Sequence, residues 1–441
     1  MDKQKFILVI SSAIFAALVL LNLLTVFTPE IGFDALWYHL TLPKLWLYKH
    51  QWFFPGGLMY YSVMPRLSET LFIPLIALTG YIGPKFLQFL AGLGTALLTY
   101  RISRFLKISK FHSTMATFSF YITWLVSWQS GSAYIDLIRT FLEISALWSL
   151  IRGKWLRGSL FLGLAIGTKW LSLGSLAIYA LIFGPQIISP ALLIASPWFI
   201  IAAYFTRNPV YPLFEPFLSH TLPSFTELIP RILFSPLSLT RPVDDFLTPL
   251  AGIFFIITLI NFFYSKGNVR KISLLGLLGI LFSVSLNPPS SRFMLPFLPA
   301  LTISTMYALD RLKHPSLNFF KYVLLASFVF ILALRVIAFE KYIPFLTLRQ
   351  TRDEFLTQMS PKLPDTFIDS DSFVKDNLEG KKIIIDRLHN LYYFPYDFDH
   401  TSWVEGDKGY DYLVTVKEDP GNLNMELIHT NQVGIQIFKL K

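Results

Sequence analysis

The feature that most constrains this chain is a series of long apolar runs separated by short basic turns. An α-helix needs about 20 apolar residues to cross the hydrocarbon core of a bilayer, so such runs predict membrane spans. Hydrophobic residues make up 53% of the chain and charged residues 15%, more apolar content than one water-soluble core can bury. Eleven candidate spans follow: 6–27, 84–100, 113–129, 133–151, 158–168, 171–184, 187–205, 247–264, 272–287, 293–310 and 318–338.

The fifth and sixth runs are short for spans. Two arrangements fit residues 158–184: one long helix, or two half-helices broken near Lys169. The first run, after a basic start, is too long for a signal-peptide core and has no small-residue cleavage site behind it. It predicts a retained first helix.

The net charge of +10 does not indicate a nucleic-acid partner, because the basic excess lies in the membrane part. Residues 341–441 hold 12 Lys and Arg against 16 Asp and Glu. Cysteine is absent, which excludes disulfides, thiolate zinc sites and cysteine nucleophiles. No phosphate-binding Gly-Lys-Ser/Thr loop, Gly-x-Ser-x-Gly elbow or Rossmann fingerprint occurs, so the sequence gives no support for cytosolic nucleotide chemistry.

Four turns rich in Lys and Arg orient the chain, because such turns favour the cytoplasmic side. With an odd number of spans, all four share the side of the N-terminus. The sequence therefore predicts a multi-pass protein of the cell (inner) membrane, with the N-terminus in the cytoplasm and residues 341–441 outside. The turns are Arg101–Lys110, Arg152–Arg157, Lys266–Lys271 and Arg311–Lys313.

The chain after about residue 341 has turn residues, charge and short β runs. We expect a small extracytoplasmic α+β domain over 341–441, with helices at 350–359 and 372–378 and strands at 382–386, 410–417, 425–429 and 433–440. The remaining 1–340 is then an all-α transmembrane domain with two long outer loops, 29–83 and 206–246.

The first outer loop carries a candidate catalytic carboxylate. From Asp34 to His50, apolar and aromatic residues alternate with polar ones, which predicts a helix lying flat at the membrane interface. Asp34 would lie at its start, where the helix dipole favours an ionised carboxylate. Two interpretations follow for Asp34: a general base, or an N-cap that only starts the helix.

The fourth span places three ionisable residues on one helix face. Asp136, Arg139 and Glu143 are spaced i, i+3 and i+7. Ionisable groups inside a membrane are costly and usually face the bundle interior or a water-filled cavity. Asp136, nearest the outer edge, is a candidate site residue; Arg139 and Glu143 either belong to the site or form a structural ion pair.

Two cations near the outer face are candidate phosphate ligands. Lys169 lies near the end of a short span, and Arg292 follows a Pro-Pro-Ser-Ser turn at the start of another. An Arg fork and a Lys ammonium both suit phosphate, although either side chain could only extend to lipid headgroups. The 206–246 loop adds further basic candidates for substrate binding: Arg207, Arg231 and Arg241.

Several short motifs resemble the C-type (GT-C) superfamily of membrane glycosyltransferases, particularly bacterial relatives of protein O-mannosyltransferases and of aminoarabinose and rhizobial lipid A glycosyltransferases. The resemblance extends over about residues 5–310, and more loosely over 426–440. The order of the motifs along the chain, and their predicted place on one side of the membrane, carry it. The motifs are Gly32–His39, Pro65–Glu69, Ala133–Leu137, Gly163–Lys169, Asn208–Pro212 and Arg292–Pro296.

The resemblance implies transfer of a sugar from a polyprenyl-phosphate donor to a lipid, glycan or protein acceptor on the outer face of the membrane. By position, Asp34 would deprotonate the acceptor hydroxyl, with inversion at the sugar carbon. Asp136 and Glu69 would be further acidic site residues. Lys169 and Arg292 would bind the donor phosphate, and His39 and Arg139 are candidates for substrate contact.

No cofactor is required by this resemblance, and the residues predict no metal site. Ala35 follows Asp34 where some relatives have an Asp-Glu pair, which argues against a tightly held divalent cation, although some branches of the superfamily use one. Two alternatives stay open: an O-antigen ligase or polymerase, and a non-enzymatic lipid or solute transporter whose charged fourth span lines a path.

The predicted orientation can be tested with reporter fusions at Ser109, Gly267 and the C-terminus. We expect the first two reporters in the cytoplasm and the third outside, because the basic turns share the inner face. If all three report the same side, the number of spans is wrong by an odd number.

Overall fold

The computed structural model describes residues 3–215, 224–238, 240, 247–286, 290–311, 316–404, 409–416 and 425–441. The chain forms two compact units. Unit 1 contains residues 1–26, 86–131 and 135–340, and unit 2 contains residues 27–85, 132–134 and 341–441.

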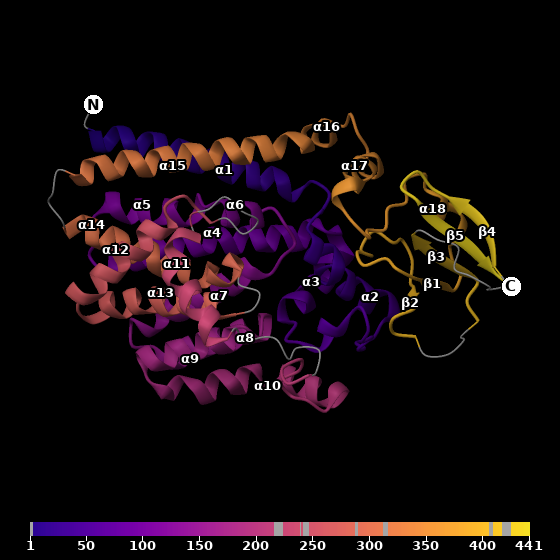
Figure 1. Cartoon of the computed structure of the whole chain (residues 1–441), viewed down its shortest axis with the longest axis horizontal. Helices are drawn as coiled ribbons and strands as arrows, with labels where there is room; N and C mark the ends of the chain where they lie inside the picture. Colours follow the sequence, from indigo (N-terminus) through magenta and orange to yellow (C-terminus); the bar gives the residue numbers. More distant parts are fainter. Residues whose placement is uncertain are drawn as a thin grey trace. The chain divides into compact units, whose positions relative to one another are not determined.

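Unit 1 is helical throughout its described part (Figure 1). Its helices are α1 (Lys3–Val26), α4 (Ile82–Phe105, whose first turn belongs to unit 2), α5 (Lys110–Tyr121), α6 (Trp124–Gln129), α7 (Asp136–Leu150), α8 (Trp155–Thr168), α9 (Ser172–Phe183), η3 (Pro185–Ile187), α10 (Ile188–Thr206), α11 (Phe225–Ser238), α12 (Ala251–Tyr264), α13 (Gly267–Ser285), η5 (Ser291–Phe297), α14 (Leu298–Arg311) and α15 (Ser316–Phe339).

The expected multi-span membrane architecture is confirmed, whereas the number of eleven spans stays a prediction. Among the described residues, five helical stretches are long and apolar enough to cross a membrane: Gln4–Val26, Pro185–Thr206, Gly267–Ser285, Ser291–Arg311 and Phe319–Leu346. Three shorter apolar helices cover Leu67–Thr79, Ser172–Phe183 and Ala251–Tyr264.

The helices of unit 1 pack in neighbouring groups. α1 and α15, far apart in the sequence, lie side by side (Figure 1). α8 packs against both α7 and α10, and α12, α13 and α14 pack against one another. A Cβ on Gly163 of α8 would come within 2.6 Å of the Ala191 carbonyl oxygen, so glycine there permits the close approach of α8 and α10.

Two apolar regions, 113–129 and 158–184, are each divided into two helices. The region 158–184 is two helices, α8 and α9, separated at Lys169–Leu171, so the second of the two expected arrangements is present. The predicted 113–129 span is divided into α5 and α6, because the Thr123 hydroxyl accepts a hydrogen bond from the Val126 amide at 3.3 Å and starts a new helix.

Unit 2 combines residues 27–85, which include the predicted first outer loop, with the tail, residues 341–441. Its sheet has the order β2-β1-β3-β5-β4, in which β2, β1 and β3 are parallel and β3, β5 and β4 antiparallel (Figure 1). The elements are η1 (Ala35–His39), α2 (Thr41–Lys49), η2 (Tyr60–Val63), α3 (Leu67–Thr79), η6 (Glu340–Tyr342), α16 (Ile343–Leu346), α17 (Arg352–Met359), η7 (Ser360–Lys362), α18 (Phe373–Asn377), β1 (Ile383–Ile385), β2 (Asp399–His400), β3 (Tyr412–Val416), β4 (Met425–Thr430) and β5 (Ile435–Leu440).

The α+β composition expected for the tail is confirmed, with all four predicted strands and both predicted helices. The two-residue strand β2 was not predicted, because Asp399–His400 is too short to show an alternating pattern.

Helix is present over residues 34–50 as expected, whereas its flat placement at the membrane interface stays a prediction. The structure has a π-helix, η1, followed by α2. Leu45 of α2 lies in a hydrophobic cluster with Phe367, Phe394 and Phe398 of the tail. The apolar face of α2 is therefore covered by protein, and loop 29–83 forms one compact unit with residues 341–441.

Polar contacts fasten the same helix to the tail. The Lys44 ammonium donates to the carbonyl oxygens of Tyr392 and Phe394, both at 2.7 Å, and the Tyr48 hydroxyl donates to the Pro395 carbonyl at 2.9 Å. Burial, with a smaller contribution from the Arg352 charge, lowers the pKa of Lys44 to about 7.

This lowered pKa predicts a pH dependence of stability. Between about pH 7 and 10, Lys44 holds its proton in the unfolded chain and releases it in the folded chain, so stability should rise with pH, by roughly 1 kcal/mol per pH unit at most. Thermal unfolding of the whole protein in detergent at pH 7.5 and 9.5 would measure the rise.

Lys44→Met should make that rise smaller, because it removes the contribution of this one amine. Tyr48→Phe is the matched control, because it removes a hydrogen bond between the same helix and tail segment but leaves the amine. An equal rise in the Lys44→Met variant would contradict the prediction.

Candidate functional site

A buried carboxylate in unit 1 gathers both candidate phosphate ligands. The Lys169 ammonium donates to Oδ1 of Asp136 at 2.7 Å, and the Arg292 guanidinium donates to Oδ2 at 3.2 Å. The Gln129 amide also donates to Oδ2, at 3.1 Å. The structure thus brings together three residues that the sequence placed 33 and 123 positions apart.

Each of these side chains comes from the end of a helix. Asp136 is the first residue of α7 and Lys169 is the residue that ends α8. Arg292 is the second residue of η5, which packs against α7 and α13. The Ser290 hydroxyl accepts a hydrogen bond from the Arg292 amide at 3.3 Å, which caps the start of η5.

The cluster exposes its cations more than its carboxylate. Asp136 is 1% exposed, whereas Lys169 is 15% and Arg292 19% exposed. Two cations and one carboxylate give these three side chains a net charge of +1. An anion that approaches from solvent would therefore meet the cations first.

A second ion pair lies deeper on the same face of α7. Arg139 Nε donates to Glu143 Oε1 at 2.8 Å, and both side chains are fully buried. The structural ion pair considered for these residues is present. Arg139, a candidate for substrate contact, has no exposed surface in this conformation.

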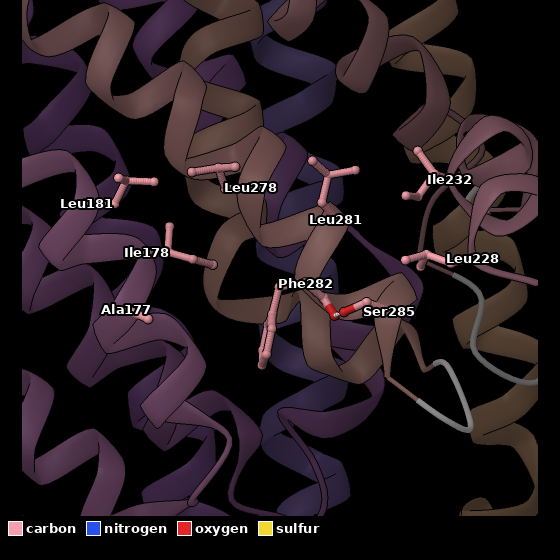
Figure 2. A pocket seen from close by; sticks show the side chains of 9 residues that line it. All are labelled: Ala177, Ile178, Leu181, Leu228, Ile232, Leu278, Leu281, Phe282 and Ser285. Carbon is pink, nitrogen blue, oxygen red and sulfur yellow. Dashed lines mark hydrogen bonds between the residues drawn. The ribbon is translucent and has the colours of Figure 1, made fainter. Parts of the chain in front are cut away.

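An open apolar groove of about 430 Å³ lies on α9, α11 and α13 (Figure 2). Its lining is aliphatic and aromatic except for one serine hydroxyl. Such a surface suits hydrocarbon. The lining residues are Ala177, Ile178, Leu181, Leu228, Ile232, Leu278, Leu281, Phe282 and Ser285.

Asp34, in unit 2, is the residue before η1 and is half-buried. Its side chain makes no capping hydrogen bond to that helix. The N-cap interpretation therefore does not account for this carboxylate.

Glu69, His39 and Arg66 form a buried cluster within loop 29–83. Glu69 Oε1 accepts hydrogen bonds from His39 Nδ1 at 2.6 Å and from Arg66 Nη1 at 2.7 Å. Burial lowers the pKa of His39, against an opposing effect of Glu69. His39 is thus neutral at pH 7, and the accepting carboxylate assigns its proton to Nδ1. Nε2 is then an acceptor, with no hydrogen-bond partner among the described residues.

Glu30 binds backbone amides of the turn that precedes Asp34, and it was not among the predicted site residues. Its Oε1 accepts from the amides of Ile31 and Gly32, at 2.9 and 2.7 Å, and its Oε2 accepts from the Ala133 amide at 2.6 Å. A Cβ on Gly32 would lie 2.6 Å from the Tyr134 ring, so the turn requires glycine. In the sequence, the one signal for this binding of backbone amides is a carboxylate two residues before a glycine, Glu30 and Gly32.

Arg66 was also missed as a site residue, although the i, i+3 spacing of Arg66 and Glu69 was a signal for the pair. Three basic candidates from the 206–246 loop remain. Arg207 is exposed at the end of α10, and Arg231 of α11 donates to the Leu286 carbonyl at 3.3 Å. Arg241 lies outside the described residues.

Within the part of the chain that the structure describes, no group of three or more His, Asp or Glu side chains could hold a metal ion.

The sequence matches no family model, and no curated protein sequence matches it either. Two solved structures match over nearly the whole of both chains. One is ArnT from Cupriavidus metallidurans in the apo state, with a TM-score of 0.62 and 13% identity over 97% of each chain. The other is the same protein bound to undecaprenyl phosphate, with a TM-score of 0.61 and 12% identity over 98% of each chain. The resemblance to GT-C glycosyltransferases is therefore confirmed at the level of the fold: this chain has the fold of ArnT.

Proposed function

We propose that this protein is a membrane glycosyltransferase that moves a sugar from a polyprenyl-phosphate donor to an envelope acceptor, on the outer face of the cell membrane. The observation that carries the proposal is the pair of cations, Lys169 and Arg292, bound to the buried Asp136. The fold of ArnT, which binds undecaprenyl phosphate, supports it. That fold also favours glycosyl transfer over the ligase and transport alternatives.

The charge of the cluster suits the donor. A sugar–phosphate–polyprenyl diester carries one negative charge, which the net +1 of Lys169, Arg292 and Asp136 balances. As the sugar leaves, negative charge grows on the phosphate oxygen, and fixed cations nearby stabilise that charge. In this proposal Asp136 holds the two cations together and sets the net charge, rather than accepting a proton.

The groove on α9 and α13 is our proposed site for the donor's hydrocarbon chain (Figure 2). α9 begins three residues after Lys169, and α13 ends at Ser285, seven residues before Arg292. From Ser172, where α9 begins, to Ala177 at the groove is about 7.5 Å of helix, at about 1.5 Å per residue. A polyprenyl phosphate held by the cations could thus extend its chain along this surface.

Asp34 is our proposed general base. In the proposed step, the acceptor oxygen bonds to the anomeric carbon while the bond from that carbon to the phosphate oxygen breaks. The acceptor proton passes to the Asp34 carboxylate, and polyprenyl phosphate leaves on the opposite side, so the configuration inverts. No covalent intermediate or cofactor is needed.

In this proposal Glu69 and His39 stabilise the first outer loop and do not take part in the chemical step. The Glu69 side chain has no exposed surface, and it is bonded to both His39 and Arg66. Its burial favours a role in holding the first outer loop in shape over direct contact with substrate.

Replacing Asp34 tests the base. Mass spectrometry of envelope glycans and lipid-linked sugars, with and without the protein, would first identify the product. In cells that lack the natural gene, Asp34→Asn should then lower the rate of product formation by roughly 100-fold or more, the usual scale of general acid–base catalysis. The exposed Glu227→Gln is the control, and near-normal product from Asp34→Asn would refute the mechanism.

Replacing Arg292 tests the phosphate site. In detergent, the affinity for undecaprenyl phosphate should fall several-fold for Arg292→Lys, which keeps the charge but loses the fork, and about 10- to 100-fold for Arg292→Ala. Arg157→Ala, an exposed cation in a basic turn, should bind as wild type does.

If Arg292 only extends to lipid headgroups, all these variants should bind equally in detergent, where no bilayer remains. Equal affinities would remove Arg292 from the proposed site.

A further inference from the structure

Two matched rows of polar side chains join α7 to α9. On α7 the row is Asp136, Arg139 and Glu143, and on α9 it is Ser172, Ser175 and Tyr179, each spaced i, i+3 and i+7. All six are at most 1% exposed, so these contacts form inside the helix bundle of unit 1.

The Ser172 hydroxyl is the centre of this contact. It accepts a hydrogen bond from Arg139 Nε at 3.0 Å and donates its own proton to Glu143 Oε1 at 2.8 Å. Arg139 Nη2 donates to the Ser175 hydroxyl at 3.1 Å. Both residues of the α7 ion pair, Arg139 and Glu143, are therefore hydrogen-bonded to the first turn of α9.

A third contact fixes α9 one turn further on. The Tyr179 hydroxyl donates to the backbone carbonyl of Glu143 at 3.0 Å. α9 is thus attached to α7 at three successive positions, which sets both its rotation and its position along α7.

Lys169 is joined directly to this fixed turn. The Ser172 amide donates to the Lys169 carbonyl at 2.9 Å, across the break between α8 and α9. Lys169 itself has an extended backbone, with φ −153° and ψ 122°. Its flexible side chain has four carbons, so the place from which it starts decides whether the ammonium meets Asp136.

A gain in the protein's folding stability does not by itself explain why the Arg139–Glu143 ion pair is buried here. A buried ion pair often adds nothing over apolar side chains of similar size, because its charges lose their hydration. Arg139 Nη1 and Glu143 Oε2 have no hydrogen-bond partner among the described residues, which adds to that cost. The hydrogen bonds to α9 give the pair a geometric role.

We propose that Arg139 and Glu143 are positioning residues that act through Ser172 to place the Lys169 ammonium on Asp136, and so preorganise the site for the donor's phosphate. This inference rests on the proposed function, in which Lys169 binds that phosphate.

Removing one hydroxyl tests the link. Ser172→Ala should weaken binding of undecaprenyl phosphate to the full-length protein in detergent about tenfold, and Ser172→Thr, which keeps the hydroxyl, should restore it. The donor's KM should rise with little change in kcat. Ser149→Ala is the matched control, because Ser149 is a buried serine of α7 whose hydroxyl donates to the Ser145 carbonyl of the same helix, at 2.9 Å.

A double-mutant cycle separates positioning from a general loss of structure. In a Lys169→Met protein, Ser172→Ala should have no further effect on affinity, because the residue through which it acts is gone. Additive losses would overturn the inference. If Ser172→Ala does not insert into the membrane, Ser175→Ala, which removes only the Nη2 contact, takes its place in the cycle.

The same measurements distinguish a failure of the proposed phosphate site at Lys169 from a failure of the positioning role of Arg139 and Glu143. If Lys169→Met binds undecaprenyl phosphate as wild type does, the phosphate site itself is wrong, and the positioning role is wrong with it. If Lys169→Met binds weakly while Ser172→Ala and Ser175→Ala bind normally, only the positioning role is wrong.

Discussion

The arrangement of unit 1 depends on one interaction, the ion pairs that the buried Asp136 carboxylate makes with Lys169 and Arg292. A carboxylate with 1% exposure is costly unless opposite charges lie beside it. Here those charges come from two segments that regular helices would not place there: the break after α8 and the start of η5. The break between α8 and α9 is thus also what brings an ammonium to Asp136.

Local spacing in the sequence predicted part of this arrangement. The i, i+3, i+7 pattern of α7 and the shortness of the spans around Lys169 are properties of neighbouring residues, and both were found. The pairing of Asp136 with Lys169 and Arg292 joins residues 33 and 156 positions apart. Helical periodicity contains no information at that range, so only the packing of α7, α8 and η5 could reveal which cations share the carboxylate.

The same limit applies to unit 2. Alternating residues predicted the main strands of the tail, and an amphipathic pattern predicted helix in the first outer loop. The pattern could not say what covers the apolar face of that helix, and Leu45 packs against tail residues such as Phe367 and Phe394. Glu30 was missed because its partners are backbone amides, which leave no signature in side-chain pattern.

The charge of the Asp136 cluster bears on release of the product as well as binding of the donor. The proposed donor is a diester with one negative charge, whereas the product, a phosphate monoester, carries about −1.5 to −2 near pH 7. Two cations alone would hold the product more strongly than the donor, since each pair of unit charges at 4 Å is worth about 4 kcal/mol near a protein surface. Asp136 offsets one of the two cations at all times. In the proposed reaction it therefore favours a site that binds the monoanion, stabilises the growing charge during transfer, and still lets the more highly charged product leave.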